Sequence, residues 1–278
     1  MVDGDSVLDV VVVVTPNSDR SEPLMSSLSR QEKIRVHALN AVMLRSSAEV
    51  ATSTYKFDQE FSHYVYSRLL RPGEIGCSIS NTLARKSIAR LENGGLILED
   101  DARVVDMKKL VSTSMDFLNQ FQGTSAVLSF YWTENPNYVS GLHSSMKMLR
   151  HFGHPPYTVA YALTKEAANR LVESNTPARF LADWPICKVK FFVSLEDIVR
   201  HGDDQTTSVI NVELTDLEQN RLGILRRAAI YSGIYFFCNR HARFAFRDFI
   251  QFLWKPRILF HLNQIWLWSA FRLHKERK

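Results

Sequence analysis

A short apolar stretch that runs directly into three acidic residues is the feature that most constrains how this chain folds. Two glycines precede residues 96–98 (Leu-Ile-Leu), and Glu99, Asp100 and Asp101 follow them. An apolar run of this length after a glycine pair predicts a buried β-strand. Open α/β sheets bind their ligands in the crevice outside the carboxyl ends of the strands, so we expect the three carboxylates to lie in such a crevice.

Three neighbouring carboxylates can be interpreted in two ways. Their negative charges repel one another unless something positive lies between them, and a divalent cation meets that need. Oxygen ligands suit Mg²⁺ or Mn²⁺, so residues 99–101 are candidates for a metal site. The alternative is a solvated acidic turn, and the three residues alone do not decide between the two.

The rest of the chain alternates between apolar runs with strand character and segments with helical spacing. Residues 7–14 are apolar on both faces and predict a central strand. Helical spacing predicts helices over residues 79–91 and 110–121, and Thr164 is placed to cap a third. Further strands are predicted over residues 34–39, 126–131, 157–163 and 189–195. This order predicts an α/β sheet of the Rossmann type.

Three segments are less regular. Residues 46–70 predict a loop with one helix, and Pro72 and Gly73 predict a turn after which Ser78 or Ser80 caps the next helix. Residues 135–154 are rich in Asn, Ser, Gly and His, which is typical of an active-site flap or of an irregular excursion. The glycine fingerprints of P-loop and dinucleotide-binding proteins are absent, so any nucleotide must be held in another way.

Composition narrows the class of protein. The chain has 278 residues, of which 45% are hydrophobic and 23% charged, as expected for one globular domain with or without an appendage. Its three cysteines are scattered and lack metal-binding spacing, which favours a reducing compartment over a disulfide scaffold. The apolar run at residues 10–14 is too short for a signal peptide or a membrane span.

The net charge of +5 is unevenly distributed. Residues 227–278 carry ten Lys or Arg against two Asp or Glu and hold 13 of the 31 aromatic residues. We therefore predict a domain over residues 1–225 and a basic, aromatic, helical tail over residues 226–278. Such a tail suits the anionic inner face of a membrane, although the aromatic residues are equally able to complete the core. No nucleic-acid-binding module is recognisable, so nucleic acid is not an expected partner.

Two blocks of the sequence resemble a known family. Residues 73–80 (GEIGCSIS), a helix, and then residues 98–101 (LEDD) resemble the signature of glycosyltransferase family 25, the lipooligosaccharide galactosyltransferases and their relatives. Residues 157–171 followed by residues 182–185 (ADWP) are similar to its second block. The resemblance covers roughly residues 7 to 210. One departure is Asn81, where family members usually carry His.

The resemblance implies a GT-A type fold, a Rossmann-like sandwich that binds a nucleotide-sugar. It further implies transfer of a sugar, commonly galactose from UDP-galactose, with inversion at the anomeric carbon, to a glycan or lipid-linked saccharide such as lipopolysaccharide. A Mn²⁺ or Mg²⁺ ion on the diphosphate would stabilise the leaving group. Asp101 is then the direct metal ligand, Glu99 and Asp100 bind the metal through water or contact the ribose, and Arg20 meets the phosphates.

An inverting transfer needs a general base for the acceptor hydroxyl, and Asp183 is the candidate. It lies in the matching second block beside Trp184, on which a sugar ring can pack. Its other possible roles are a helix cap or a buried ion-pair partner, and Asp203 and Asp204 are rivals for the catalytic role. His201 is either a late metal ligand or an ordinary loop residue.

Two other function classes stay open. A metal-dependent phosphoester hydrolase would use the same acids, but it needs a second cluster rich in His and Asp that we do not find. The second class is a catalytically inactive family member that serves as a membrane-associated binding subunit. Asn81, where family members usually carry His, is the residue that suggests it. The preferred prediction is a cytoplasmic glycosyltransferase, peripherally associated with the inner face of the membrane.

Overall fold

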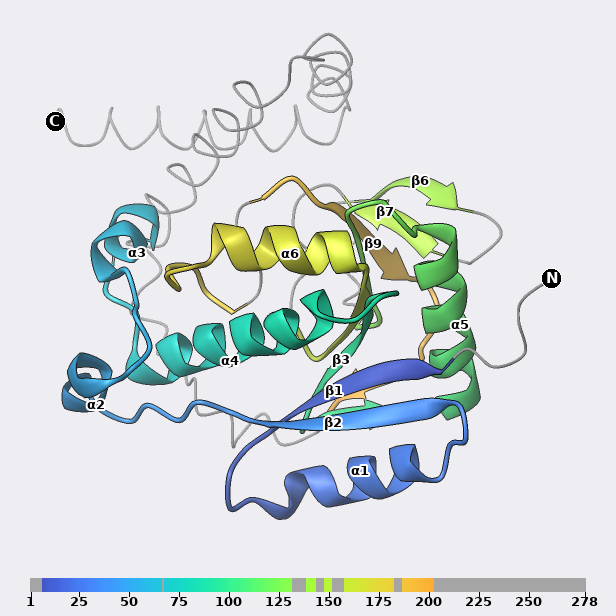
Figure 1. Cartoon of the computed structure of the whole chain (residues 1–278), viewed down its shortest axis with the longest axis horizontal. Helices are drawn as coiled ribbons and strands as arrows, with labels where there is room; N and C mark the ends of the chain where they lie inside the picture. The colour runs from blue at the N-terminus through green and yellow to red at the C-terminus, as the bar shows by residue number, and fades with distance from the viewer. Residues whose placement is uncertain are drawn as a thin grey trace, which may run out of the picture. The chain divides into compact units, whose positions relative to one another are not determined.

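The computed structural model describes residues 7–66, 68–131, 139–143, 148–151, 158–182 and 187–202. In this part of the chain, eight strands form one sheet in the order β2-β1-β3-β8-β5-β9-β7-β6 (Figure 1). The strands are β1 (Leu8–Val14), β2 (Ile34–Asn40), β3 (Gly95–Glu99), β5 (Ala126–Ser129), β6 (Val139–His143), β7 (Met148–His151), β8 (Ala160–Leu163) and β9 (Lys190–Ser194). The predicted α/β, Rossmann-like class is confirmed.

The sheet is parallel at one side and mixed at the other. β1 pairs in parallel with both β2 and β3, with Val12 opposite Ala38 and Leu98. β8 runs antiparallel between β3 and β5, β5 and β9 are parallel, and β7 and β6 continue antiparallel. The antiparallel direction of β8 is not visible in its sequence, because a short apolar run reads the same way in either direction.

Helices cover both faces of the sheet (Figure 1). Even-numbered β1 residues such as Val10 and Val12 pack with α1 (Glu22–Ser29) and α5 (Met107–Gln120). Odd-numbered residues such as Val11 and Val13 pack with α4 (Pro72–Ala89) and α6 (Lys165–Ser174). Side chains of a strand alternate between the two faces, so residues 10–14 of β1 are all apolar because both faces of the strand are buried there, whereas Asp9 is only partly buried and faces Arg35 and His37. This confirms the prediction that β1 is a central strand.

The predicted elements with clear periodicity are all present, with ends shifted by a few residues. β1, β2, β3, β5, β9 and α5 lie where the sequence predicts them. Thr164 is the N-cap of α6, and its hydroxyl accepts a hydrogen bond from the backbone N–H of Ala167 at 3.2 Å.

The predicted start of α4 is wrong. The helix begins at Pro72, six residues before Ser78 and eight before Ser80, the two serines proposed as its cap. Proline is favoured in the first turn of a helix, where its missing N–H has no intrahelical partner anyway. The Glu74 carboxylate accepts the backbone N–H of Arg71 at 2.8 Å and completes the cap, so Ser78 and Ser80 lie inside the helix.

Several other short elements were not predicted from the sequence. Residues 46–70 hold two helices rather than one, α2 (Ser47–Thr52) and α3 (Gln59–Tyr66). The segment predicted as a flap or excursion contributes β6 and β7 to the sheet, and its remaining residues lie outside the described ranges. A separate two-stranded sheet pairs β4 (Ala102–Val104) with β10 (Val199–His201). Strands of three residues are too short to show a period.

The predicted tail, residues 226–278, and its boundary at residue 225 lie outside the described residues, so the division into two domains stays a prediction. Within the described residues, no helix combines the length and the apolar composition needed to cross a membrane.

Candidate functional site

Three loops meet at the carboxyl ends of the parallel strands β1 and β3. The backbone N–H of Thr15, directly after β1, donates a hydrogen bond to Asp100 Oδ2 at 3.0 Å. Arg20, in the short 3-10 helix η1 (Asp19–Ser21), places Nη2 3.3 Å from Asp101 Oδ2. His201, the last residue of β10, places Nε2 3.3 Å from the same oxygen. The structure therefore brings Arg20, Asp100 and Asp101 together at this edge of the sheet.

Asp101 is the centre of this group, because Arg20 and His201 both contact its carboxylate. Its side chain is only 15% exposed. One carboxylate oxygen, Oδ2, faces Arg20 and His201, whereas the other, Oδ1, is buried and has no hydrogen-bond partner among the described residues. Burial of a carboxylate oxygen without a partner costs free energy. A positive or hydrogen-bonding group at Oδ1 would offset that cost.

His201 is held in a defined orientation. Its Nδ1 lies 2.9 Å from the carbonyl oxygen of Gly202. A carbonyl only accepts, so Nδ1 carries a proton; the Asp101 carboxylate also only accepts, so Nε2 donates to it when it is protonated and can bind a cation when it is not. The backbone N–H of Gly202 donates to the Asp101 carbonyl at 2.9 Å, and a Cβ at position 202 would lie 3.1 Å from that oxygen. The tertiary structure thus brings His201 to the acid turn, a role that the sequence left open.

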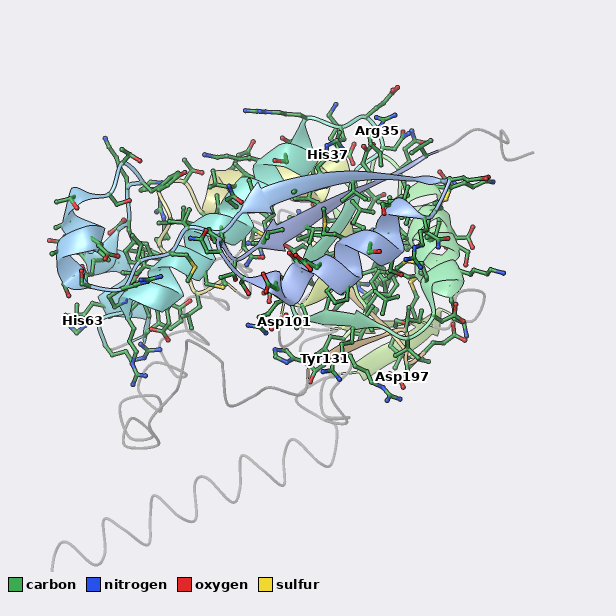
Figure 2. All side chains as sticks on the ribbon, turned by 90° about the horizontal axis from the view of Figure 1, so that it is seen from below. Arg35, His37, His63, Asp101, Tyr131 and Asp197 are labelled. Atoms are coloured by element: carbon green, nitrogen blue, oxygen red, sulfur yellow. The ribbon has the colours of Figure 1, made fainter. Side chains whose placement is uncertain are left out.

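Tyr131 is a further member of the site that sequence reasoning missed. It follows β5, and its ring centroid lies 6.3 Å from that of His201 at an interplanar angle of 68°. Figure 2 labels Tyr131 and Asp101. The available signal was its position: an aromatic residue just beyond the carboxyl end of a predicted strand.

Glu99 has a different environment from the two aspartates. Its Oε1 accepts hydrogen bonds from Thr158 Oγ1 at 2.6 Å and from Asn81 Nδ2 at 3.4 Å. Glu99 therefore contacts the polar face of α4, while Asp101 contacts Arg20 and His201. In the part of the chain that the structure describes, no three His, Cys, Asp or Glu side chains are grouped so as to hold a metal ion. The metal site predicted at Asp101 and Glu99 stays a prediction.

The described residues nevertheless fit a cation that takes most of its ligands from elsewhere. Asp101 offers its buried Oδ1, and His201 offers Nε2 beside the other oxygen, Oδ2, of the same carboxylate. Carboxylate and imidazole ligands suit Mn²⁺, and a cation on a diphosphate commonly completes its shell with phosphate oxygens and water. Asp203 and Asp204, which follow in the sequence, lie outside the described residues.

The glycine- and serine-rich signature of residues 73–80 forms the first half of α4 and packs it tightly. A Cβ at Gly76 would lie 2.3 Å from the Val42 carbonyl oxygen, so only glycine allows this approach. Ser80 Oγ accepts the backbone N–H of Val42 at 2.8 Å and donates to the Gly76 carbonyl at 2.7 Å. These two residues fix α4 against the segment that follows β2.

Glu74 anchors the start of the same helix. Its carboxylate is 5% exposed and accepts from both terminal nitrogens of Arg68, at 2.7 and 2.5 Å. Burial raises the pKa of this carboxyl, but the hydrogen bonds from Arg68 and from the Arg71 backbone, with the charges of both arginines, outweigh it and hold the pKa below its ordinary value. Glu74 is therefore a charged, structural residue.

The segment before Asp183 is held through its backbone. Asn175 Oδ1 accepts the N–H groups of Arg179 and Phe180 at 2.9 and 3.1 Å. Side chains of α3 and α4 contact the next backbone groups, through Ser62, Tyr66, Ser78 and Arg85. Asp183 itself, the predicted general base, lies outside the described residues, so its role stays a prediction.

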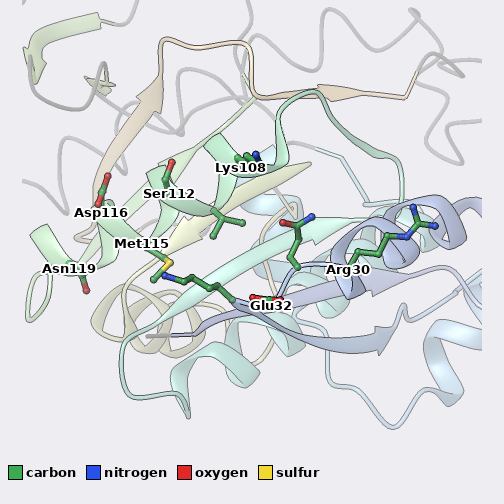
Figure 3. Close-up of a pocket in the computed structure, with 10 residues that line it drawn as sticks. Arg30, Glu32, Lys108, Ser112, Met115, Asp116 and Asn119 are labelled. Atoms are coloured by element: carbon green, nitrogen blue, oxygen red, sulfur yellow. The ribbon is translucent and has the colours of Figure 1, made fainter. Parts of the chain in front are cut away.

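A separate groove of about 530 Å³ lies between α5 and the connection from α1 to β2 (Figure 3). It is lined by Arg30, Gln31, Glu32, Lys33, Lys108, Val111, Ser112, Met115, Asp116 and Asn119. None of the predicted site residues lines it, so size alone does not identify the site.

Comparison with known proteins identifies the family. The model of glycosyltransferase family 25 (LPS biosynthesis protein) matches residues 11–186, which include the α4 signature, the acid turn and the second block. In a comparison with curated proteins, no sequence matches the chain. The family match covers more than half of the chain and agrees with the resemblance carried by residues 73–80 and 98–101, so this chain belongs to glycosyltransferase family 25.

Proposed function

We propose that the chain transfers a sugar from a UDP-sugar, UDP-galactose being the first choice, to a glycan or lipid-linked saccharide such as lipopolysaccharide, with inversion and with a GT-A type active site. The family supports glycosyltransferase activity and hence a sugar donor and a saccharide acceptor. The nature of the donor, the stereochemistry and the metal are the proposal.

The observation that carries the proposal is Asp101, at the carboxyl ends of β1 and β3: its Oδ2 faces His201, and its buried Oδ1 has no hydrogen-bond partner among the described residues. That position in an open α/β sheet is where nucleotide ligands bind. A bound Mn²⁺ or Mg²⁺, held by Asp101 and His201, would neutralise the charge that develops on the leaving diphosphate.

The residues around Asp101 have complementary tasks in this proposal. Arg20 is 38% exposed and forms its ion pair with Asp101 from the solvent side, so it can turn toward the phosphates of a bound donor. Glu99 and Asp100, consecutive residues at the end of β3, bind the metal through water or contact the ribose. Tyr131 adds an aromatic surface beside His201.

The acceptor side depends on Asp183 and on the tail. Asp183 takes the proton of the acceptor hydroxyl as it attacks the anomeric carbon. Residues 226–278, basic and aromatic, bind the anionic membrane surface at which a lipid-linked acceptor is found. Removal of residues 226–278 is expected to abolish co-sedimentation with anionic liposomes, and unchanged co-sedimentation would refute the membrane role.

The central test is sugar transfer or release from UDP-galactose with Mn²⁺, compared between the wild type and Asp101→Asn. Asparagine keeps the shape of the side chain but removes the charge. We expect at least about a 100-fold loss of activity, as for other electrostatic groups in active sites. Asp116→Asn, an exposed aspartate on α5, is the matched control and is expected to keep wild-type activity.

The outcomes separate the open alternatives. Activity that vanishes in the Asp101 variant supports the transferase. Donor binding without turnover in the wild type favours an inactive, membrane-associated binding subunit. Full activity of the Asp101 variant would refute the proposed role of the acid turn.

A further inference from the structure

A chain of hydrogen bonds runs through the buried face of α4 and ends on Glu99. Arg85 Nε donates to the hydroxyl of Tyr161 at 3.2 Å, and that hydroxyl donates to Asn81 Oδ1 at 3.0 Å. Asn81 Nδ2 then donates to Glu99 Oε1 at 3.4 Å. At its other end, Arg85 Nη2 donates to the carbonyl of Ala182 at 3.0 Å. Three elements, α4, β8 and β3, supply the members.

The direction of every bond in the chain follows from chemistry. A guanidinium only donates, so the Tyr161 oxygen accepts from Arg85 and its proton is directed at Asn81. Asn81 must therefore present its carbonyl oxygen to Tyr161. Its amide nitrogen is then the group that faces Glu99, and the orientation of the amide is set by Arg85 two bonds away.

Burial makes this arrangement rigid. Arg85 and Tyr161 are fully buried, and Asn81 is 1% exposed. Burial raises the pKa of Tyr161 to about 12, against the lowering effect of the Arg85 charge. The hydroxyl therefore keeps its proton throughout the physiological pH range and remains a donor to Asn81.

We propose that Tyr161 is a positioning residue: with Arg85 and Asn81 it orients the Glu99 carboxylate for binding of the nucleotide-sugar donor. The inference rests on the proposed function, in which Glu99 contacts the donor. The same chain ends on Ala182, one residue before Asp183, so it also ties the donor side of the site to the segment that carries the predicted base. Thr158, the second donor to Glu99 Oε1, limits the carboxylate to one orientation.

The test is a double-mutant cycle on donor affinity, with UDP-galactose and Mn²⁺ as the probe and isothermal titration calorimetry as the measurement. Tyr161→Phe keeps the ring and removes both hydrogen bonds of the hydroxyl. We expect Tyr161→Phe to raise the Kd of the donor about 10-fold, because the Glu99 carboxylate is then no longer oriented for its contact with the donor. Glu99→Ala is expected to raise the Kd at least as much, and the double variant is expected to match Glu99→Ala alone, because Tyr161 acts through Glu99.

Tyr55→Phe is the matched control, since Tyr55 is an exposed residue far from this chain in sequence, and its Kd is expected to equal that of the wild type. In steady-state kinetics, Tyr161→Phe should raise KM for the donor more than it lowers kcat. Should Tyr161→Phe fail to fold, Asn81→Ala breaks the chain next to Glu99 and leaves the contact between Arg85 and Tyr161, and the same increase in Kd is expected.

Each possible result either supports or overturns the proposed role of Tyr161. A wild type that binds the donor, together with a Tyr161 variant of unchanged Kd, overturns this inference and leaves the proposed function standing. Effects of Tyr161→Phe and Glu99→Ala that multiply in the double variant also overturn it, because they would show independent, purely structural roles. A wild type that binds no UDP-sugar refutes the proposed function and this inference with it.

Discussion

The buried polar face of α4 and the acid turn at residues 99–101 both carry parts of the family signature, yet their environments are opposite. On α4, Glu74, Ser78 and Ser80 are buried and hydrogen-bonded to neighbouring segments. In the acid turn, Asp101 forms a partly exposed ion pair with Arg20 and keeps one carboxylate oxygen without a partner among the described residues.

The difference teaches that a family signature mixes two kinds of residue. The α4 residues hydrogen-bond to neighbouring segments and build a structural frame that holds the fold together, whereas in the acid turn one oxygen of Asp101 has no hydrogen-bond partner among the described residues. Changes in the frame should therefore lower stability, and changes in the turn should lower donor binding and activity at nearly unchanged stability. Three predictions in order of decreasing effect test this contrast.

The largest effect on stability is expected for Gly76→Ala. The new Cβ would lie 2.3 Å from the Val42 carbonyl oxygen, so α4 or the segment after β2 must move. We expect a loss of about 3 kcal/mol in the free energy of unfolding and a fall in Tm of roughly 6–12 °C, measured by thermal unfolding.

Gly123→Ala is the control for Gly76→Ala. Gly123 has a φ of 73°, but a Cβ there meets nothing within 4 Å, so only backbone strain of about 1 kcal/mol is expected. Equal losses in the two variants would contradict the close packing of α4.

An intermediate effect is expected for Glu74→Gln, which removes the charge that Arg68 and Arg71 face. We expect a loss of about 2 kcal/mol at pH 7, since hydrogen bonds between charged groups contribute this much. Because the pKa of Glu74 is lower in the folded chain than its ordinary 4.5, its stabilising effect is present above pH 4.5 and is lost as the pH falls through the folded value.

The difference between wild type and Glu74→Gln, measured by denaturant unfolding from pH 7 to pH 3, should therefore shrink below pH 4.5. Glu92→Gln changes an exposed glutamate just after α4 and is expected to stay within about 0.5 kcal/mol of the wild type at every pH. A pH-independent difference for Glu74→Gln would show that its charge is not what stabilises the cap.

The smallest effect on stability is expected at Asp100, inside the acid turn. Asp100→Ala removes the acceptor of the Thr15 backbone N–H and should cost about 1 kcal/mol. Asp100→Asn keeps an acceptor oxygen and should unfold within about 0.5 kcal/mol of the wild type. If the alanine variant lost as much stability as Gly76→Ala, the acid turn would belong to the structural frame and the contrast would fail.

Much of the fold follows from local patterns. The apolar run at residues 10–14 of β1 requires burial on both faces. Thr164 marks the start of α6 through its capping hydroxyl, and Gly94, with a φ of 82°, marks the turn into β3. The start of α4 was missed because the Pro72-Gly73 pair is typical of a turn, and only the carboxylate of Glu74 on the Arg71 N–H identifies a helix cap there.

The candidate site was predictable only in part. Arg20, Asp100 and Asp101 each follow a strand, so their meeting at one edge follows from parallel pairing. Tyr131 and His201 come from later strands, and their approach depends on the sheet order and on the pairing of β4 with β10. Pairing between strands far apart in sequence leaves no local pattern to read.

The sequence by itself determined that this chain is an α/β protein in which a buried strand is followed by acidic residues. The sequence also carries the signature of glycosyltransferase family 25. Both could be read because burial patterns and motif residues are local properties. Only the tertiary structure decided which oxygen of Asp101 is left without a partner among the described residues, and that Glu99 is oriented by Asn81, Tyr161 and Arg85. Contacts of that kind join residues from different elements, and their geometry is set when the helices pack on the sheet.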